Sequence, residues 1–184
     1  MDDKTYRKCT HGLTIVYTGN GKGKTTAALG LCLRAVGHGN KVAIIQFIKS
    51  NWPYGEVEGL KRLGPDVHLE SLGAGCIGLP GDDKPIEEHK AAAQQALEAA
   101  RQTIGEANYN TVILDEIHVA AKLNLIRTQD ILELIRMKPT QMNLVLTGRD
   151  AHDDVIAAAD LVTEMREIKH PFQNGYLGKQ GIDF

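Results

Sequence analysis

Aromatic residues are scarce in this chain: phenylalanine, tryptophan and tyrosine together make up 5% of its 184 residues. Single-stranded nucleic acids are commonly bound by stacking bases on aromatic side chains, so we do not expect such a platform here. The formal net charge of −2 gives no electrostatic attraction for nucleic acid or for an anionic membrane surface. We therefore expect neither nucleic acid nor membrane as a partner.

Cysteines are also few. Cys9, Cys32 and Cys76 are odd in number and widely spaced, which matches neither a disulfide framework nor a zinc site. No apolar run approaches the ~20 residues that span a bilayer. The first eight residues are polar and lack the apolar core of a signal peptide. These absences favour a reducing compartment and predict a cytoplasmic protein.

What the chain does contain is typical of one globular domain, with 42% hydrophobic and 24% charged residues. Residues 1–12 are polar, and we expect a flexible N-terminal segment there. Residues 13–184 are expected to form a single α/β domain.

The most informative stretch is Thr18-Gly19-Asn20-Gly21-Lys22-Gly23-Lys24-Thr25-Thr26. It follows an apolar, strand-like run and precedes a helix-favouring run, which is the layout of a phosphate-binding P-loop. In such a loop the glycines let successive backbone N–H groups converge on phosphate oxygens. Lys24 would neutralise phosphate, and the Thr25 hydroxyl would bind Mg²⁺.

The loop departs from the usual G-x-x-x-x-G-K-[ST] pattern at its start. Thr18 occupies the first glycine position, and Gly19 comes one residue later. The loop is therefore GxxxGKT with an additional lysine, Lys22. That lysine could be a second phosphate contact or simply a solvated side chain.

Strand-like and helix-like segments alternate along the whole chain, which predicts an α/β fold of three layers with a mostly parallel central sheet. The P-loop makes this a P-loop NTPase-like (RecA-like) fold. Strands are expected at 13–17, 42–47, 67–72, 111–114, 143–147 and 161–168. Helices are expected at 25–36, 56–63, 85–104, 117–123 and 129–137, the last capped by Thr128, and a further helix capped by Asp150 or Asp153 is expected to run through Ala159.

Polar residues follow three of the expected strands. The glycine loop, Asp115-Glu116 and Gly148-Arg149 all come at strand ends, where ligands bind to parallel sheets. A carboxylate at Asp115 or Glu116 could hold Mg²⁺ directly or through water. Neighbouring strand residues point to opposite faces, so only one of the two acids is expected to face the metal. Arg149 could contact a phosphate or a ribose, or be an ordinary surface residue.

One further side chain could take part in the chemistry. His118 follows the acids and could act as a base, although packing is the more typical role for a histidine in that position. The residues alone leave the reaction open. An ATPase would use Glu116 to position water, a kinase would need an acceptor pocket, and a third possibility is attack at the 5′ carbon of the nucleotide with triphosphate leaving.

The chain resembles the P-loop type of ATP:corrinoid adenosyltransferase. The resemblance runs from about Leu13 to the C-terminus, and the shortened glycine loop with its additional lysine is its most specific part. Six groups of residues carry it: 18–28, 34–39, 46–49 with 52–56, 114–116, 147–149, and 162–165 with 169–170 and 181–184.

This resemblance implies transfer of the 5′-deoxyadenosyl group of ATP to the Co(I) of a corrinoid, with release of triphosphate. It implies Mg²⁺ dependence, a homodimer, ATP bound in the reverse direction, and a corrinoid-reducing flavoprotein as partner. By motif position, residues 19–26 would bind triphosphate, and Arg149 would be a further nucleotide contact. Thr25 and Glu116 would hold Mg²⁺. The catalytic residues would be Lys24, Thr25 and Glu116.

Two departures from the family pattern stand out. The family often carries a Phe-x-Trp pair after the third strand, where Ala74 and Cys76 stand here. Displacement of the corrinoid's lower ligand would then depend on other apolar residues, such as Ile77 or Leu79. The segment before the first strand is also short. A P-loop ATPase or kinase, or a non-catalytic nucleotide-dependent corrinoid-binding protein, are the alternatives.

Overall fold

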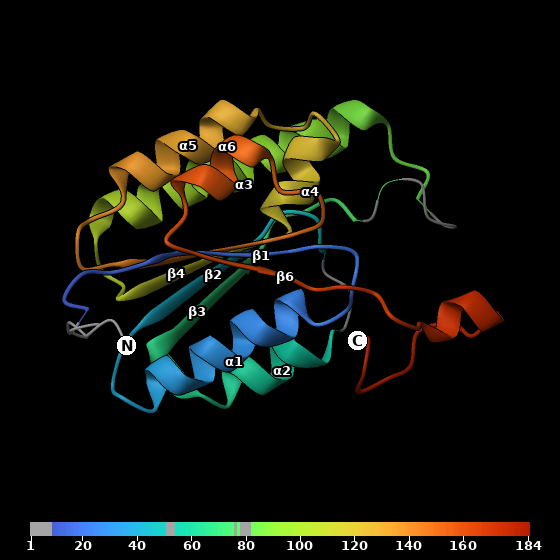
Figure 1. The fold of residues 1–184 in the computed structure, drawn as a ribbon, viewed down its shortest axis with the longest axis horizontal. Coiled ribbons are helices and arrows are strands. Elements are labelled where there is room, and N and C mark those ends of the chain that lie inside the picture. Colours follow the sequence, from blue (N-terminus) through green and yellow to red (C-terminus); the bar gives the residue numbers. More distant parts are fainter. Residues whose placement is uncertain (1–8, 51–53, 76, 78–81) are drawn as a thin grey trace, which may run out of the picture.

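The fold is built on a six-stranded sheet in the order β3-β2-β4-β5-β1-β6, and every pairing among its strands is parallel (Figure 1). The structure is a computed structural model that describes residues 9–50, 54–75, 77 and 82–184. The predicted loose residues 1–8, together with Cys76 and Leu79, lie outside the described residues. The strands are β1 (Thr14–Thr18), β2 (Val42–Gln46), β3 (Val67–Ser71), β4 (Thr111–Asp115), β5 (Asn143–Thr147) and β6 (Leu161–Glu164).

Helices cover both faces of this sheet. One face carries α1 (Lys24–Val36) and α2 (Gly55–Lys61), and the other carries the remaining four helices (Figure 1). Those four are α3 (Ile86–Glu106), α4 (Ile117–Lys122), α5 (Thr128–Met137) and α6 (Asp153–Ala158). The predicted three-layer α/β architecture is confirmed. Among the described helices, none combines the length and apolar character needed to cross a bilayer.

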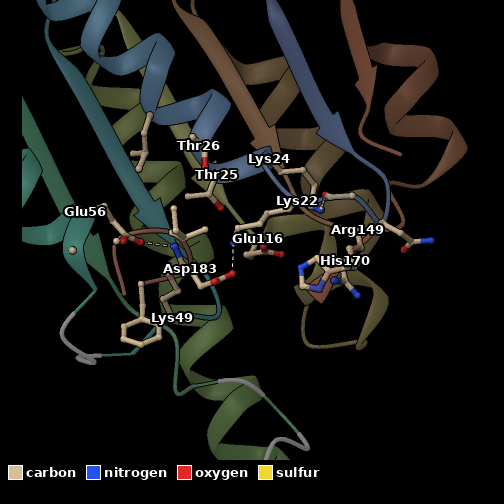
Figure 2. A pocket seen from close by; sticks show the side chains of 18 residues that line it. Lys22, Lys24, Thr25, Thr26, Lys49, Glu56, Glu116, Arg149, His170 and Asp183 are labelled. Carbon is tan, nitrogen blue, oxygen red and sulfur yellow. Dashed lines mark hydrogen bonds and ion pairs between the residues drawn. The ribbon is translucent and has the colours of Figure 1, made fainter. Parts of the chain in front are cut away.

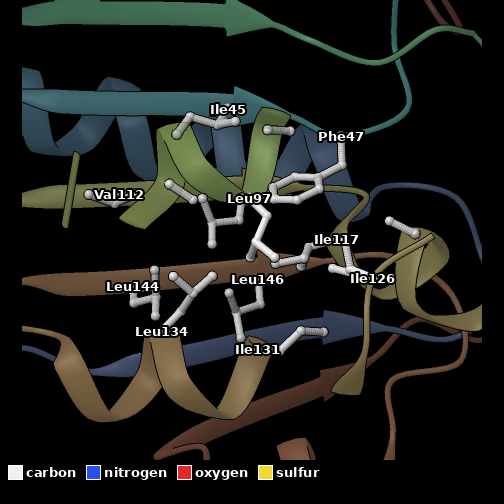
Figure 3. Close-up of a cluster of buried hydrophobic side chains, with 14 of the residues drawn as sticks. Ile45, Phe47, Leu97, Val112, Ile117, Ile126, Ile131, Leu134, Leu144 and Leu146 are labelled. Carbon is white, nitrogen blue, oxygen red and sulfur yellow. The ribbon is translucent and has the colours of Figure 1, made fainter. Parts of the chain in front are cut away.

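The alternation of side chains along each strand separates the core into two layers. Ile44, Ile113 and Val145 belong to the layer beneath α1. Ile45 and Leu146, with their neighbours on the same strands, pack on the opposite face against the longer helices (Figure 3). Because the central strands are buried on both faces, they are continuously apolar, which is why the sequence identified them.

The last strand is shorter than predicted. It ends at Glu164 rather than Ile168, because among the described strands it pairs with β1 alone, and β1 ends at Thr18, opposite Glu164. Beyond this point the first strand gives way to the glycine loop. The Met165 carbonyl then accepts a hydrogen bond from the Gly21 N–H, so strand pairing is replaced by a contact with that loop.

Two predicted helix caps are wrong. Helix α5 already includes Thr128, and its cap is Arg127, whose backbone N–H donates to Asp130 Oδ2 at 2.8 Å. Helix α6 is capped by neither Asp150 nor Asp153. Instead, His152 Nδ1 accepts from the Asp154 N–H at 3.2 Å, and Asp150 is engaged elsewhere. In both helices the first turn is capped by a side chain other than the predicted one: Asp130 in α5 and His152 in α6.

A pair of glycine substitutions tests this packing. A Cβ at Gly12 would lie 2.0 Å from the Met142 carbonyl oxygen, whereas a Cβ at Gly30 on the exposed face of α1 meets nothing within 4 Å. We expect Gly12→Ala to destabilise the protein by roughly 2 kcal/mol or more, because backbone must move. Gly30→Ala should instead stabilise it by about 0.5–1 kcal/mol. Urea unfolding measures both, and equal midpoints would contradict the packing at Gly12.

Candidate functional site

A cleft of about 650 Å³ opens at the carboxyl ends of the strands (Figure 2). Loop residues 20–26, Glu116 and Arg149 line it, so most of the predicted site residues come together. Gly19 is not part of the lining, but its carbonyl oxygen contacts the Lys24 side chain. Lys49, the start of α2 and several C-terminal residues complete the walls.

The glycine loop depends on backbone shapes that other residues adopt poorly. Gly19 and Gly23 have φ angles of 90° and 113°, in the left-handed region that favours glycine. A Cβ at Gly21 would lie 2.6 Å from the Met165 carbonyl oxygen. The loop therefore fits closely against the chain leaving β6 while its amides remain beside the cleft.

Lys24 lies at the centre of this loop. Its ammonium donates to the carbonyl oxygens of Gly19 and Gly21, both at 2.8 Å, and the residue is only 7% exposed. Burial lowers the pKa of Lys24, and the nearby Glu116 carboxylate opposes that effect. A poorly hydrated cation held by neutral carbonyls is well placed to exchange them for phosphate oxygens.

Asp115 is the most enclosed acid of the site, at 1% exposure. Its Oδ1 accepts from the hydroxyls of Thr25 at 2.8 Å and Thr147 at 2.7 Å. Its Oδ2 accepts from the Gln46 amide at 3.2 Å and lies 3.4 Å from Lys49 Nζ. Asp115 thus joins the first turn of α1 to β5 and β2.

Glu116 faces the cleft instead. Its backbone is left-handed, with φ of 62°, and its N–H donates to Thr147 Oγ1 at 2.9 Å. Burial raises the pKa of Glu116, and the neighbouring Asp115 raises it further, while Lys24, Lys49 and Arg149 oppose the rise. The two adjacent acids therefore occupy different environments: Asp115 is buried at the end of β4, and Glu116 lines the cleft, as Figure 2 shows.

The donor set of the cleft fits Mg²⁺. The Thr25 hydroxyl and the Glu116 carboxylate line the cleft and are oxygen donors, which this ion prefers. The described part of the chain holds no group of three or more His, Cys, Asp or Glu residues arranged for a metal. Such a site suits an ion that takes one or two protein ligands and completes its shell with phosphate oxygens and water.

Sequence reasoning missed the contribution of Lys49. Its ammonium lies 2.5 Å from Glu56 Oε1 and 5.1 Å from the centre of the Tyr54 ring, so it ties the start of α2 to the site. The attraction of Asp115 and Glu56 outweighs burial and raises the pKa of Lys49. The sequence did contain a signal for this lysine. Lys49 comes shortly after the buried strand β2, just as Asp115 and Glu116 come at the end of β4.

The C-terminal residues were also missed as part of the site. His170 and residues 181–184 line the cleft, and Asp183 Oδ1 lies 2.5 Å from the additional loop lysine, Lys22 (Figure 2). Asp183 Oδ2 accepts from the Lys179 N–H at 2.8 Å, which fixes the carboxylate in a turn. This segment has no hydrophobic period, so nothing in its own pattern indicated where it would lie. His118, considered as a base, does not line this cleft.

Comparison with known proteins identifies clear relatives. Residues 10–184 match the family described as "ATP:corrinoid adenosyltransferase BtuR/CobO/CobP". A corrinoid adenosyltransferase of Escherichia coli strain K12 is 36% identical over 173 residues, covering 94% of this chain and 86% of that protein. A corrinoid adenosyltransferase of Sinorhizobium is 39% identical over 186 residues, covering 100% of this chain and 84% of its own length.

A solved structure shares the fold at much lower sequence identity. The KaiC-like protein PH0186 from Pyrococcus horikoshii OT3 superposes with a TM-score of 0.52 at 16% identity, covering 86% of this chain and 75% of that one. The likeness concerns the fold alone.

The environment of Glu116 predicts a pH dependence. Because the folded-state pKa lies above the ordinary value of 4.5, the folded protein holds this proton more tightly than the unfolded chain. The associated stability is present at low pH and is lost as pH rises through the folded pKa. Glu116→Gln should therefore raise the free energy of unfolding at pH 7 and converge with the unmutated protein below about pH 4. Urea unfolding across this range checks it, and a variant less stable at pH 7 would contradict it.

The contact between Lys22 and Asp183 predicts an effect on anion binding. Asp183 is a negative charge beside the loop that is expected to bind phosphates, so it competes for Lys22. We expect Asp183→Asn to tighten the binding of tripolyphosphate about threefold to tenfold by calorimetry. The change should shrink as salt is raised, because the pair is partly exposed. The matched control is Glu58→Gln, which removes an exposed lysine partner on α2, and weaker binding in Asp183→Asn would refute the competition.

Proposed function

Because the chain belongs to the ATP:corrinoid adenosyltransferase family, we propose that its cleft holds the triphosphate of ATP on the glycine loop and leaves the 5′ carbon open to a corrinoid. As a member of this family it is a transferase that moves the adenosyl group of ATP to a corrinoid. The observation that best supports the assignment of the cleft is the convergence of loop residues 20–26, Glu116 and Arg149 around one space.

In the proposed reaction, the electron pair of Co(I) attacks the 5′ carbon of ATP. The cobalt–carbon bond forms as the bond from that carbon to the α-phosphate oxygen breaks, and triphosphate leaves with the bonding pair. Negative charge therefore grows on the bridging oxygen and spreads over the triphosphate. Lys24 and the loop amides would stabilise that charge, and Lys22 and Arg149 would add to the positive field.

Thr25 and Glu116 are the residues that we propose hold Mg²⁺, with Asp115 orienting Thr25 through its hydrogen bond. When bound, the ion would supply further positive charge to the departing triphosphate. The nucleophile comes from the corrinoid, so the protein's own task is to orient the 5′ carbon and grip the leaving group.

We further propose that residues 13–184 act as a single domain and that the protein works as a cytoplasmic homodimer with a corrinoid-reducing flavoprotein. Exposed apolar side chains support a second copy of the chain as a partner. Four large apolar side chains are strongly exposed in the segment that follows the edge strand β6: Ile168 (78%), Phe172 (70%), Tyr176 (68%) and Leu177 (85%). Cys9 and Cys32 are free thiols, in keeping with a reducing compartment.

Product analysis tests the function, and Lys24→Ala tests its site. Incubation with ATP, Mg²⁺ and chemically reduced cobalamin should yield a light-sensitive cobalt–carbon bond and free triphosphate. Lys24→Ala should lower kcat by about 10²–10³-fold, because a contact that strengthens in the transition state is lost. Far-ultraviolet circular dichroism should show that this variant remains folded.

The control is Lys61→Ala, which removes an exposed lysine of α2 and should leave turnover unchanged. Formation of ADP and phosphate as the only products would refute the transfer of the adenosyl group. Unchanged turnover in Lys24→Ala would show that the chemistry takes place away from the glycine loop.

A further inference from the structure

His170 is, among the described residues, the only histidine that lines the nucleotide cleft (Figure 2). It follows β6 and caps a short 3₁₀ helix, η2 (Pro171–Asn174). The residue is half-buried, so its ring forms part of the wall of the cleft. A histidine in such a wall offers a hydrogen-bond donor or an acceptor, and the partner of each ring nitrogen decides which.

The cap of η2 determines which ring nitrogen is available. His170 Nδ1 accepts a hydrogen bond from the Phe172 N–H at 3.2 Å. A nitrogen that accepts carries no hydrogen, so the hydrogen of the neutral ring is on Nε2. A doubly protonated ring would carry one on Nε2 as well. Nε2 is therefore a donor in either charge state, and it makes no hydrogen bond to another described residue.

The segment that carries His170 runs beside the glycine loop. The Gly21 N–H donates to the Met165 carbonyl oxygen at 2.6 Å. A Cβ at Gly21 would also lie 2.7 Å from the carbonyl carbon of Arg166, which shows how closely the two segments approach. The chain shortly before His170 is thus in direct contact with the loop that is expected to hold phosphates.

A carboxylate of the protein already lies in this neighbourhood. Asp183 Oδ1 is 2.5 Å from Lys22 Nζ, and its Oδ2 accepts from the Lys179 N–H at 2.8 Å. The pKa of Asp183 is lowered first by that backbone donor and then by Lys22, and His170 contributes further in the same direction. His170 is therefore close enough to act on an anion at Lys22. A phosphate oxygen that replaced the carboxylate would meet the same donors.

We propose that His170 is a further catalytic residue, whose Nε2–H donates to the triphosphate of ATP and stabilises the negative charge that grows on this group as it leaves. The inference rests on the proposed function, because the whole triphosphate is the leaving group only when the 5′ carbon is attacked. The hydrogen stays on Nε2. The bonds that form and break are those already given, and triphosphate still takes the bonding pair. The competing explanation is that the ring serves only as the cap of η2.

Two substitutions separate the donor from the cap. His170→Asn keeps an oxygen at the start of η2 that can accept from the Phe172 N–H, but its amide is too short to replace Nε2. His170→Gln carries an amide N–H at about the distance of Nε2 and loses the favourable cap. We expect His170→Asn to lower kcat about tenfold to a hundredfold, the usual effect of losing a hydrogen bond to a charged group. His170→Gln should stay within about threefold of the unmutated protein.

His152 provides a matched control. It caps α6 in the same way, because its Nδ1 accepts from the Asp154 N–H at 3.2 Å, but it does not line the nucleotide cleft. His152→Asn should therefore leave kcat unchanged. Full activity of His170→Asn would overturn the proposal. So would a larger loss in His170→Gln than in His170→Asn, since that order is expected for a cap alone.

Nuclear magnetic resonance of the unmutated protein, with ¹⁵N-labelled histidine, tests the contact without any variant. In the free protein, two-bond correlations should show Nδ1 of His170 without a hydrogen and Nε2 with one. Addition of tripolyphosphate at constant ionic strength should shift the Nε2 signal of His170 in a saturable way, while His152 remains unshifted. An unshifted His170, or equal shifts in both histidines, would overturn the proposal. This measurement decides if the variants prove to be unfolded by circular dichroism.

A failure of this proposal is distinguishable from a failure of the proposed function. Adenosyl transfer is measured by the products that the unmutated protein forms. The titration with tripolyphosphate involves neither ATP nor cobalt, so it reports on His170 even if no transfer is seen. Transfer by the unmutated protein together with an unshifted His170 would overturn the role of His170 alone.

Discussion

The buried carboxylate of Asp115 is the constraint on which the site depends. A charge enclosed to this degree is costly unless donors surround it. Its donors come from three elements, namely Thr25 on α1, Thr147 on β5 and Gln46 on β2, with Lys49 nearby. Because these bonds must form together, the first turn of α1 is fixed against the sheet, and the glycine loop before it is fixed as well.

Enclosure of Asp115 also determines what Glu116 can do. The hydroxyl of Thr147 donates to Asp115 and accepts from the Glu116 backbone, so one side chain orients both acids. With Asp115 turned inward and the Glu116 backbone left-handed, the second carboxylate lines the cleft. Its pKa is raised first by burial and then by the neighbouring Asp115. A cation beside Glu116 would favour its charged form, which is a physical argument for the Mg²⁺ site that we propose.

Much of this arrangement could be predicted from sequence because its signals are local. The central strands are apolar on both faces, the glycine loop is contiguous, and parallel strands bring their carboxyl ends together. The caps at Arg127 and His152 could not be predicted, because they depend on whether the Asp130 and His152 side chains reach back to the backbone. The contact of Lys22 with Asp183 joins residues 161 positions apart, and the C-terminal segment has no period to indicate its place.

Under the proposed function, the additional loop lysine would help this cleft to release a whole triphosphate. When water attacks the terminal phosphate, charge develops at one end of the chain and a single lysine lies near it. When a 5′ carbon is attacked, the leaving group is the entire triphosphate, so positive charge is useful along its length. Lys24 is buried at the start of α1, Lys22 is an exposed residue of the glycine loop, and Arg149 follows β5, the strand beside β1. The Asp183 carboxylate occupies Lys22 at the edge of the cleft, so a triphosphate that uses this outer charge must first displace Asp183.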